Sequence, residues 1–207
     1  MMKITRVEKK QGTRYTVYVD DEYWYILDIE LIAANGIREG LCCDEAFLDD
    51  VRMQAERRKA KERALYLLEY RDHTRKELVD KLKRSVSSEI AEETADRMEE
   101  LGFLDDERYA ESVAGWMLTQ KRLGKRAALF KMQQKGFSRE VAEEAIRLVD
   151  SDPKDAIREL IEQRYGRYLI DQKGVRKVTN ALARLGHSYY DIKEVIREYY
   201  ENEDDYE

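Results

Sequence analysis

Residues that break helices are scarce in this chain. Its 207 residues include one proline and ten glycines, while 40% of the residues are charged. This composition suits long solvated helices better than a β-sandwich. No apolar run approaches the ~18 residues that a membrane-spanning helix needs, and the first ten residues, MMKITRVEKK, contain no apolar stretch of the kind found in signal peptides. We therefore expect no membrane partner and a cytoplasmic location.

Cysteine and histidine, the residues of most redox and zinc sites, are also nearly absent. The two cysteines, Cys42 and Cys43, are adjacent, and the two histidines, His73 and His187, lie far apart in the sequence. Neither pair has the spacing of a zinc site or a redox motif. The chain also has no glycine-rich phosphate-binding loop, nucleophile elbow or HExxH string. The sequence therefore favours a binding protein over an enzyme, with no metal and no cofactor.

An apolar pattern recurs roughly every 50 residues. It consists of pairs spaced i, i+4, which place both side chains on one face of a helix. The pairs are Leu78 with Leu82, Ala128 with Met132, and Val178 with Leu182, and a second series follows about ten residues later at Ile90, Val141 and Ile192. Repetition at this period is typical of stacked helical repeats that share a continuous core. We therefore expect three repeats that present a long surface to a partner.

Capping residues divide each repeat into three helices. Thr74 with Glu77 forms a capping box, and Asp152 precedes the only proline, a combination that favours a helix start. Asp105 and Asp106 are better explained by helix capping than by metal binding, because no group of histidines or glutamates accompanies them. The expected helices span residues 50–71, 74–85 and 87–101, then 105–122, 124–135 and 138–149, then 152–167, 171–185 and 188–201.

The first 27 residues follow a different pattern. They contain three β-rich runs, which predict a small antiparallel sheet of two or three strands. These runs are residues 4–7, 15–19 and 23–27. A short helix is expected at residues 29–34, followed by a link, GIREGLCCDE, and by a long helix that begins near residues 47–50.

The predicted fold is therefore mainly α, with tandem three-helix repeats forming an elongated curved array and a small N-terminal β-hairpin or sheet. The expected domains are residues 1–48 for the sheet and short helix, 49–102, 103–150 and 151–201 for the three repeats, and 202–207 for an acidic tail. We expect a monomer. The acidic tail is expected to be frayed and solvated, and a tail that binds a partner is the alternative.

Positive charge is concentrated in the middle of a chain whose formal net charge is −6. Residues 119–139 contain seven cations and no acid: Lys121, Arg122, Lys125, Arg126, Lys131, Lys135 and Arg139. We expect these seven cations to be uncompensated, so that the stretch can hold phosphates or an acidic protein surface, and the alternative is a solvated helical face. A second basic cluster, Arg57, Arg58, Lys59 and Lys61, continues to Arg63 but is partly neutralised by Glu56 and Glu62. Binding and solvation are equally supported for this second cluster.

Most aromatic residues outside the N-terminal sheet sit at helical spacings beside aliphatic residues, which favours packing in the core or between repeats. Base stacking is the alternative for a few of them. They are Tyr66, Tyr70, Tyr109, Trp116, Phe130, Tyr165, Tyr168, Tyr189, Tyr190, Tyr199 and Tyr200.

Three strings within these repeats resemble the RecX family of regulatory proteins. They are HTRKELVDKL, ELGFLDDERYAESV and KRLGKRAALFKMQQKG, and the resemblance covers about residues 60–200. The leading strands and short helix resemble the N-terminal extension of some members. One departure is Val86, which stands where the later repeats have Gly136 and Gly186, so the first repeat's turn between its last two helices is expected to differ.

The resemblance implies a non-enzymatic modulator of the RecA recombinase in DNA repair, recombination and the SOS response. Similar proteins bind the RecA filament on single-stranded DNA and inhibit its ATP hydrolysis, strand exchange and co-protease activity. The basic stretch of residues 119–139 would contact the filament, with weak direct contact to DNA. The alternative is a direct nucleic-acid binder with helix-turn-helix-like units. A scaffold for another protein is a third alternative.

Overall fold

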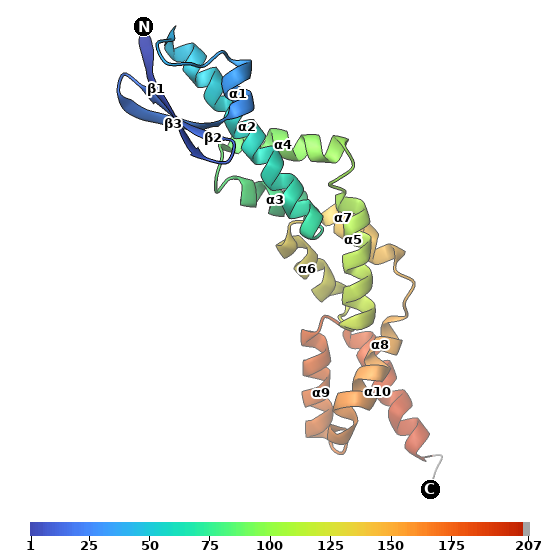
Figure 1. The fold of residues 1–207 in the computed structure, drawn as a ribbon. Helices are drawn as coiled ribbons and strands as arrows, with labels where there is room; N and C mark the ends of the chain where they lie inside the picture. Colours follow the sequence, from blue (N-terminus) through green and yellow to red (C-terminus); the bar gives the residue numbers. More distant parts are fainter. Residues whose placement is uncertain (205–207) are drawn as a thin grey trace. The chain divides into compact units, whose positions relative to one another are not determined.

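The computed structural model describes residues 1–204, with side chains through Tyr199. Within this range the chain forms four strands and ten α-helices (Figure 1). The residues divide into two compact parts. The N-terminal body comprises residues 1–71 and 78–101, and the C-terminal body comprises residues 72–77 and those from 102 onward.

The N-terminal body begins with a four-stranded antiparallel sheet. Its strands are β1 (Met2–Gln11), β2 (Arg14–Val19), β3 (Glu22–Asp28) and β4 (Cys42–Cys43), in the order β3-β2-β1-β4. The three predicted strands are confirmed. The fourth was missed, because a two-residue strand has no periodicity and forms only by pairing with Met2 and Lys3 of β1.

Helix α1 (Ile29–Ala34) and the start of α2 (Glu45–Tyr70) share a core with this sheet. The core includes Ile4, Val17, Leu27, Leu48 and Val51, all of which are buried. Helix α1 has the predicted bounds. Helix α2 begins two to five residues before the start expected at residues 47–50, because Asp44 caps it by accepting a hydrogen bond from the amide of Phe47 at 2.9 Å.

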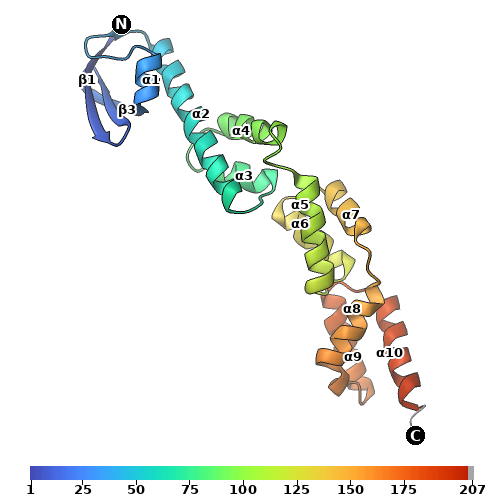
Figure 2. The same cartoon turned by 45° about the vertical axis from the view of Figure 1, so that its right-hand side comes forward.

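The remaining helices match the predicted repeats closely. The first repeat consists of α2, α3 (Arg75–Leu82) and α4 (Ser88–Glu100). The second consists of α5 (Asp106–Gly115), which ends in the π-helix η1 (Trp116–Gln120), followed by α6 (Lys125–Lys135) and α7 (Arg139–Leu148). The third consists of α8 (Pro153–Leu160), the π-helix η2 (Ile161–Tyr165), the 3₁₀-helix η3 (Gly166–Tyr168), α9 (Gln172–Arg184) and α10 (Tyr189–Asp204). Figure 2 shows the second and third repeats from another side.

The structure confirms the predicted helix caps and the burial of the apolar pairs. Asp105, Ser138 and Asp152 each accept a hydrogen bond from an amide in the first turn of the helix that follows. The six residues of the apolar pairs are buried, and the second and third repeats each have a core cluster of their own. Helix α10 continues to Asp204, into the expected acidic tail. The rest of that tail, residues 205–207, lies outside the described residues.

Candidate interaction surface

The basic stretch of residues 119–139 runs from the end of η1, through α6, to the first residue of α7. Three of its seven cations have acidic partners. Arg122 pairs with Glu159, Lys135 pairs with Glu77 at 3.0 Å, and Arg139 pairs with Glu143 at 2.7 Å. The expectation of seven uncompensated cations is therefore wrong for these three, because their acids lie outside the stretch and two of them are far away in the sequence.

Lys135 is held in a half-buried position at the end of α6. Burial opposes its charge, but hydrogen bonds to Tyr109 and Glu77 outweigh burial and raise the pKa of the Lys135 ammonium. Its carbonyl accepts a hydrogen bond from the Thr74 hydroxyl at 3.0 Å. Lys135 therefore stabilises the contact between the α6–α7 turn and the start of α3.

The other four cations of the stretch are exposed and have no ion pair among the described residues. They are Lys121, Lys125, Arg126 and Lys131. Two large aromatic side chains are exposed beside them: Trp116 is 50% exposed and Phe130 is 61% exposed. We call these six residues the α6 surface. The Lys121 ammonium lies 4.8 Å from the centre of the Trp116 ring, and Phe130 shares one helical face with Arg126.

The start of α6 is also where the third repeat packs against the second. The amide of Gly124 donates to the carbonyl of Leu185 at 2.9 Å, and His187 Nε2 lies 3.0 Å from the carbonyl of Arg122. A Cβ on Gly124 would lie 2.1 Å from the backbone carbon of Gly186. The two backbones are therefore in direct contact, and only glycine fits at position 124.

The same arrangement occurs one repeat earlier. Gly136, in the α6–α7 turn, has a φ of +110°, and a Cβ there would lie 2.9 Å from the Cβ of Lys76 at the start of α3. In both cases a glycine turn packs against the start of the second helix of the preceding repeat. The first repeat has no repeat before it, and its turn carries Val86 without a left-handed backbone. The turn therefore differs, as expected.

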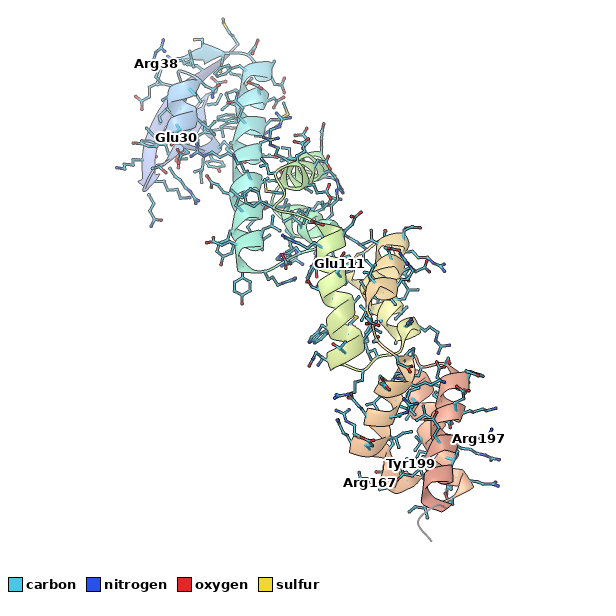
Figure 3. All side chains as sticks on the ribbon, turned by 90° about the vertical axis from the view of Figure 1, so that its right-hand side faces the viewer. Glu30, Arg38, Glu111, Arg167, Arg197 and Tyr199 are labelled. Atoms are coloured by element: carbon cyan, nitrogen blue, oxygen red, sulfur yellow. The ribbon has the colours of Figure 1, made fainter. Side chains whose placement is uncertain are left out.

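The second basic cluster is mainly structural. Arg57 pairs with Glu93 of α4 at 3.0 Å, and Arg58 pairs with Glu30 of α1, which is labelled in Figure 3. The Lys59 ammonium donates to the carbonyl of Ser85 at 3.3 Å. These three cations connect α2 to its neighbours, whereas Lys61 is exposed and has no ion pair among the described residues. The cluster therefore contributes to the fold of the N-terminal body.

The expectation that the aromatic residues pack in cores holds for only some of them. Tyr109, Tyr165, Tyr168 and Tyr199 are partly buried against the cores of their repeats. Six others are exposed: Tyr66, Tyr70, Trp116, Phe130, Tyr189 and Tyr190. The side chain of Tyr200 lies outside the described part of the chain. Helical spacing alone missed this difference, because a residue between the buried stripe and the solvated face satisfies either assignment.

A second group of exposed cations was not singled out from the sequence. It lies in the third repeat between Arg164 and Arg184, where six cations accompany a single acid, Asp171. This excess of positive charge can be counted in the sequence and indicates a basic surface. It is less conspicuous than residues 119–139, because uncharged residues separate the cations and the segment contains no long basic run.

In the part of the chain that the structure describes, no group of histidine, cysteine or acidic side chains is arranged to hold a metal ion. No helix there is long and apolar enough to cross a membrane.

Comparison with known proteins gives one consistent result. Residues 60–98 match the family model for the first three-helix domain of RecX, and residues 105–146 match the model for the second. The chain is 29% identical to the regulatory protein RecX of Clostridium tetani over 94% of this chain and 93% of that protein. It is 26% identical to the regulatory protein RecX of Staphylococcus saprophyticus over 96% and 75% of the two chains.

Two solved structures are similar as well. A crystal structure of a regulatory protein RecX superposes with a TM-score of 0.69 and 23% identity, over 96% of this chain and all of that one. RecX from Lactobacillus salivarius superposes with a TM-score of 0.64 and 28% identity, over 69% and 96% of the two chains.

Proposed function

Because the chain belongs to the RecX family of regulatory proteins, we propose that it binds the filament that RecA forms on single-stranded DNA and inhibits the filament's ATPase, strand exchange and co-protease activities. The proposed mechanism is steric and conformational. Tandem repeats that contact neighbouring RecA subunits at once would hinder filament extension or hold a state with low ATPase activity.

The observation that carries this proposal is the chemistry of the α6 surface. Protein interfaces are enriched in aromatic residues and arginine, and a few such residues supply most of the binding free energy. Trp116, Phe130 and Arg126 are residues of this kind, and all three are exposed. Burying a large aromatic side chain contributes roughly 1.5–3 kcal/mol, and an exposed one makes this contribution only when a partner covers it. The exposure of Trp116 and Phe130 beside cations therefore favours contact with an acidic protein surface.

The test is RecA ATPase activity on single-stranded DNA with and without this protein. The informative variant is Lys121→Glu, Lys125→Glu and Lys131→Glu combined. Arg122 and Arg126 stay unchanged, because Arg122 pairs with Glu159 and Arg126 donates to the Ala183 carbonyl at 3.4 Å. We expect the triple variant to melt like the parent and to inhibit at least tenfold less potently, a loss of about 1.4 kcal/mol in binding.

A matched control reverses three exposed lysines of the N-terminal body, Lys3, Lys9 and Lys10, which changes the net charge equally. This control should inhibit like the parent. Phe130→Ala tests the apolar contribution and should weaken inhibition without changing the charge. If the parent protein does not change the ATPase rate, the proposed function is wrong, and if the triple variant is as potent as the parent, the α6 surface is only a solvated face.

A further inference from the structure

We propose that the third repeat carries a surface for the phosphate backbone of a nucleic acid, formed by the exposed cations of α9 and the segment before it. The surface comprises Arg164, Arg167, Lys173, Arg176, Lys177 and Arg184, which we call the α9 surface. This inference does not depend on RecA, because it concerns binding to nucleic acid alone.

The cations of α9 lie in one row. At 100° per residue, Lys173, Arg176, Lys177 and Arg184 fall with Asn180 inside an arc of about 100° on the helix, and the row is about 16 Å long. All five residues are exposed, while Val178 and Leu182 on the other side are buried in the core of the repeat. The sequence thus produces an amphipathic helix whose outer face contains no acid.

Two further cations extend the row at the start of α9. The Arg167 guanidinium lies 4.9 Å and the Lys177 ammonium 4.5 Å from the centre of the Tyr168 ring. Figure 3 shows Arg167 on the third repeat. Arg164 is exposed one turn earlier, in η2. Two like charges therefore lie within 5 Å of the centre of one ring, and a phosphate bound beside them would lower their repulsion.

These charges are not neutralised within the protein. None of the six cations has an acidic partner among the described residues, whereas Lys154 and Arg158 in the same repeat pair with Glu194 and Glu198 of α10. Two acids lie close to the row in sequence. Asp171 caps α9 and accepts a hydrogen bond from the amide of Gly174 at 2.6 Å, and Glu162 lines a hollow with Arg164 and Arg167. Within the described residues, therefore, no acid forms an ion pair with the α9 surface, and the four cations of α9 have no acid beside them on the outer face of the helix.

The chemistry of the row favours nucleic acid over an acidic protein. The outer face of α9 has no apolar member, and the large apolar side chain exposed beside it is Ile170, in the turn before the helix. The core of a protein interface, by contrast, is apolar and aromatic. Interfaces with nucleic acid are more polar and much more positively charged. The α6 surface, with its exposed Trp116 and Phe130, has the opposite character. The two surfaces therefore suit two different partners.

The experiment measures binding of the full chain to a fluorescein-labelled oligothymidylate by anisotropy, at salt concentrations from about 50 to 200 mM. The variant combines Lys173→Gln, Arg176→Gln and Lys177→Gln, and the control combines Lys3→Gln, Lys9→Gln and Lys10→Gln. Each phosphate contact to a single strand contributes about −0.7 to the slope of log K against log salt. We expect the slope of the variant to be shallower than that of the parent by about 2, and its affinity at low salt to be at least tenfold lower. The control should bind like the parent.

Further arms identify the ligand. The same titration with a duplex of equal length shows whether the protein binds single-stranded or double-stranded nucleic acid. Weaker binding of the variant to either ligand supports the proposal. Equal binding by variant and parent, equal losses in variant and control, or no binding by the parent at low salt would overturn it. Polyglutamate that competes as well as oligothymidylate would also overturn it, in favour of an acidic protein. Because RecA is absent, none of these results bears on the proposed function.

Discussion

Replacing Gly124 with alanine tests the contact between the second and third repeats. Gly124 has an ordinary φ of −69°, so alanine causes no strain in the backbone itself. The added Cβ, however, would lie 2.1 to 2.3 Å from three backbone atoms of Gly186 and His187. Backbone atoms cannot rotate away as a side chain can, so the turn between α9 and α10 must move.

The expected cost follows from what that movement breaks. Overpacking of this kind costs about 1–3 kcal/mol. Displacing the turn also weakens the hydrogen bond from the Gly124 amide to the Leu185 carbonyl, which contributes about 1 kcal/mol. Alanine is a poorer N-cap than glycine by roughly 0.5–1 kcal/mol. We expect a total destabilisation of about 3 kcal/mol, which lowers the melting temperature of a chain this long by roughly 6–12 °C.

Gly115→Ala is the matched control in the same body. Gly115 ends α5 with helical φ and ψ of −53°, and an added Cβ would meet no heavy atom within 4 Å. Alanine there should stabilise the protein by about 0.5–1 kcal/mol, because it lowers the entropy of the unfolded chain. The two variants therefore have opposite predicted signs. If Gly124→Ala melts at or above the parent temperature in scanning calorimetry, the third repeat does not pack against the start of α6, and the reasoning is wrong.

Two further predictions concern shape and pH. The repeats in the sequence predict an elongated array, so small-angle scattering should give a radius of gyration clearly above the ~17 Å of a compact domain of this length. A value near ~17 Å would contradict that prediction. Burial lowers the pKa of His187 below its ordinary value of 6.5, against the opposing effect of the Arg122 carbonyl, and its Nδ1 is buried without a hydrogen-bond partner. The unfolded chain then binds the proton more readily, so stability is lost as the pH falls below 6.5. The melting temperature should drop less between pH 7.5 and 5.5 in His187→Gln than in the parent, and equal drops would exclude His187 as the cause.

The sequence by itself determined the elements of this protein. Helix spans, caps such as Ser138 and Asp152, and the buried pairs at i, i+4 depend on interactions within a few residues, and such interactions can be read from a single chain. The imbalance of cations in the third repeat was readable by the same means. The position of Gly136 after a helix indicated that a glycine is needed there. The residues that it packs against, Thr74 and Lys76, could not be predicted from the sequence.

The tertiary structure decided which charges are available to a partner. Arg122 and Lys135 looked uncompensated because their acids, Glu159 and Glu77, lie 37 and 58 residues away. It also decided that β4 pairs with β1, that Arg57 and Arg58 connect α2 to its neighbours, and that Trp116 and Phe130 remain exposed. Each of these outcomes depends on groups brought together from distant parts of the chain. Local periodicity contains no information about such pairs, because ion pairing and burial are set by distance in space and not by separation in sequence.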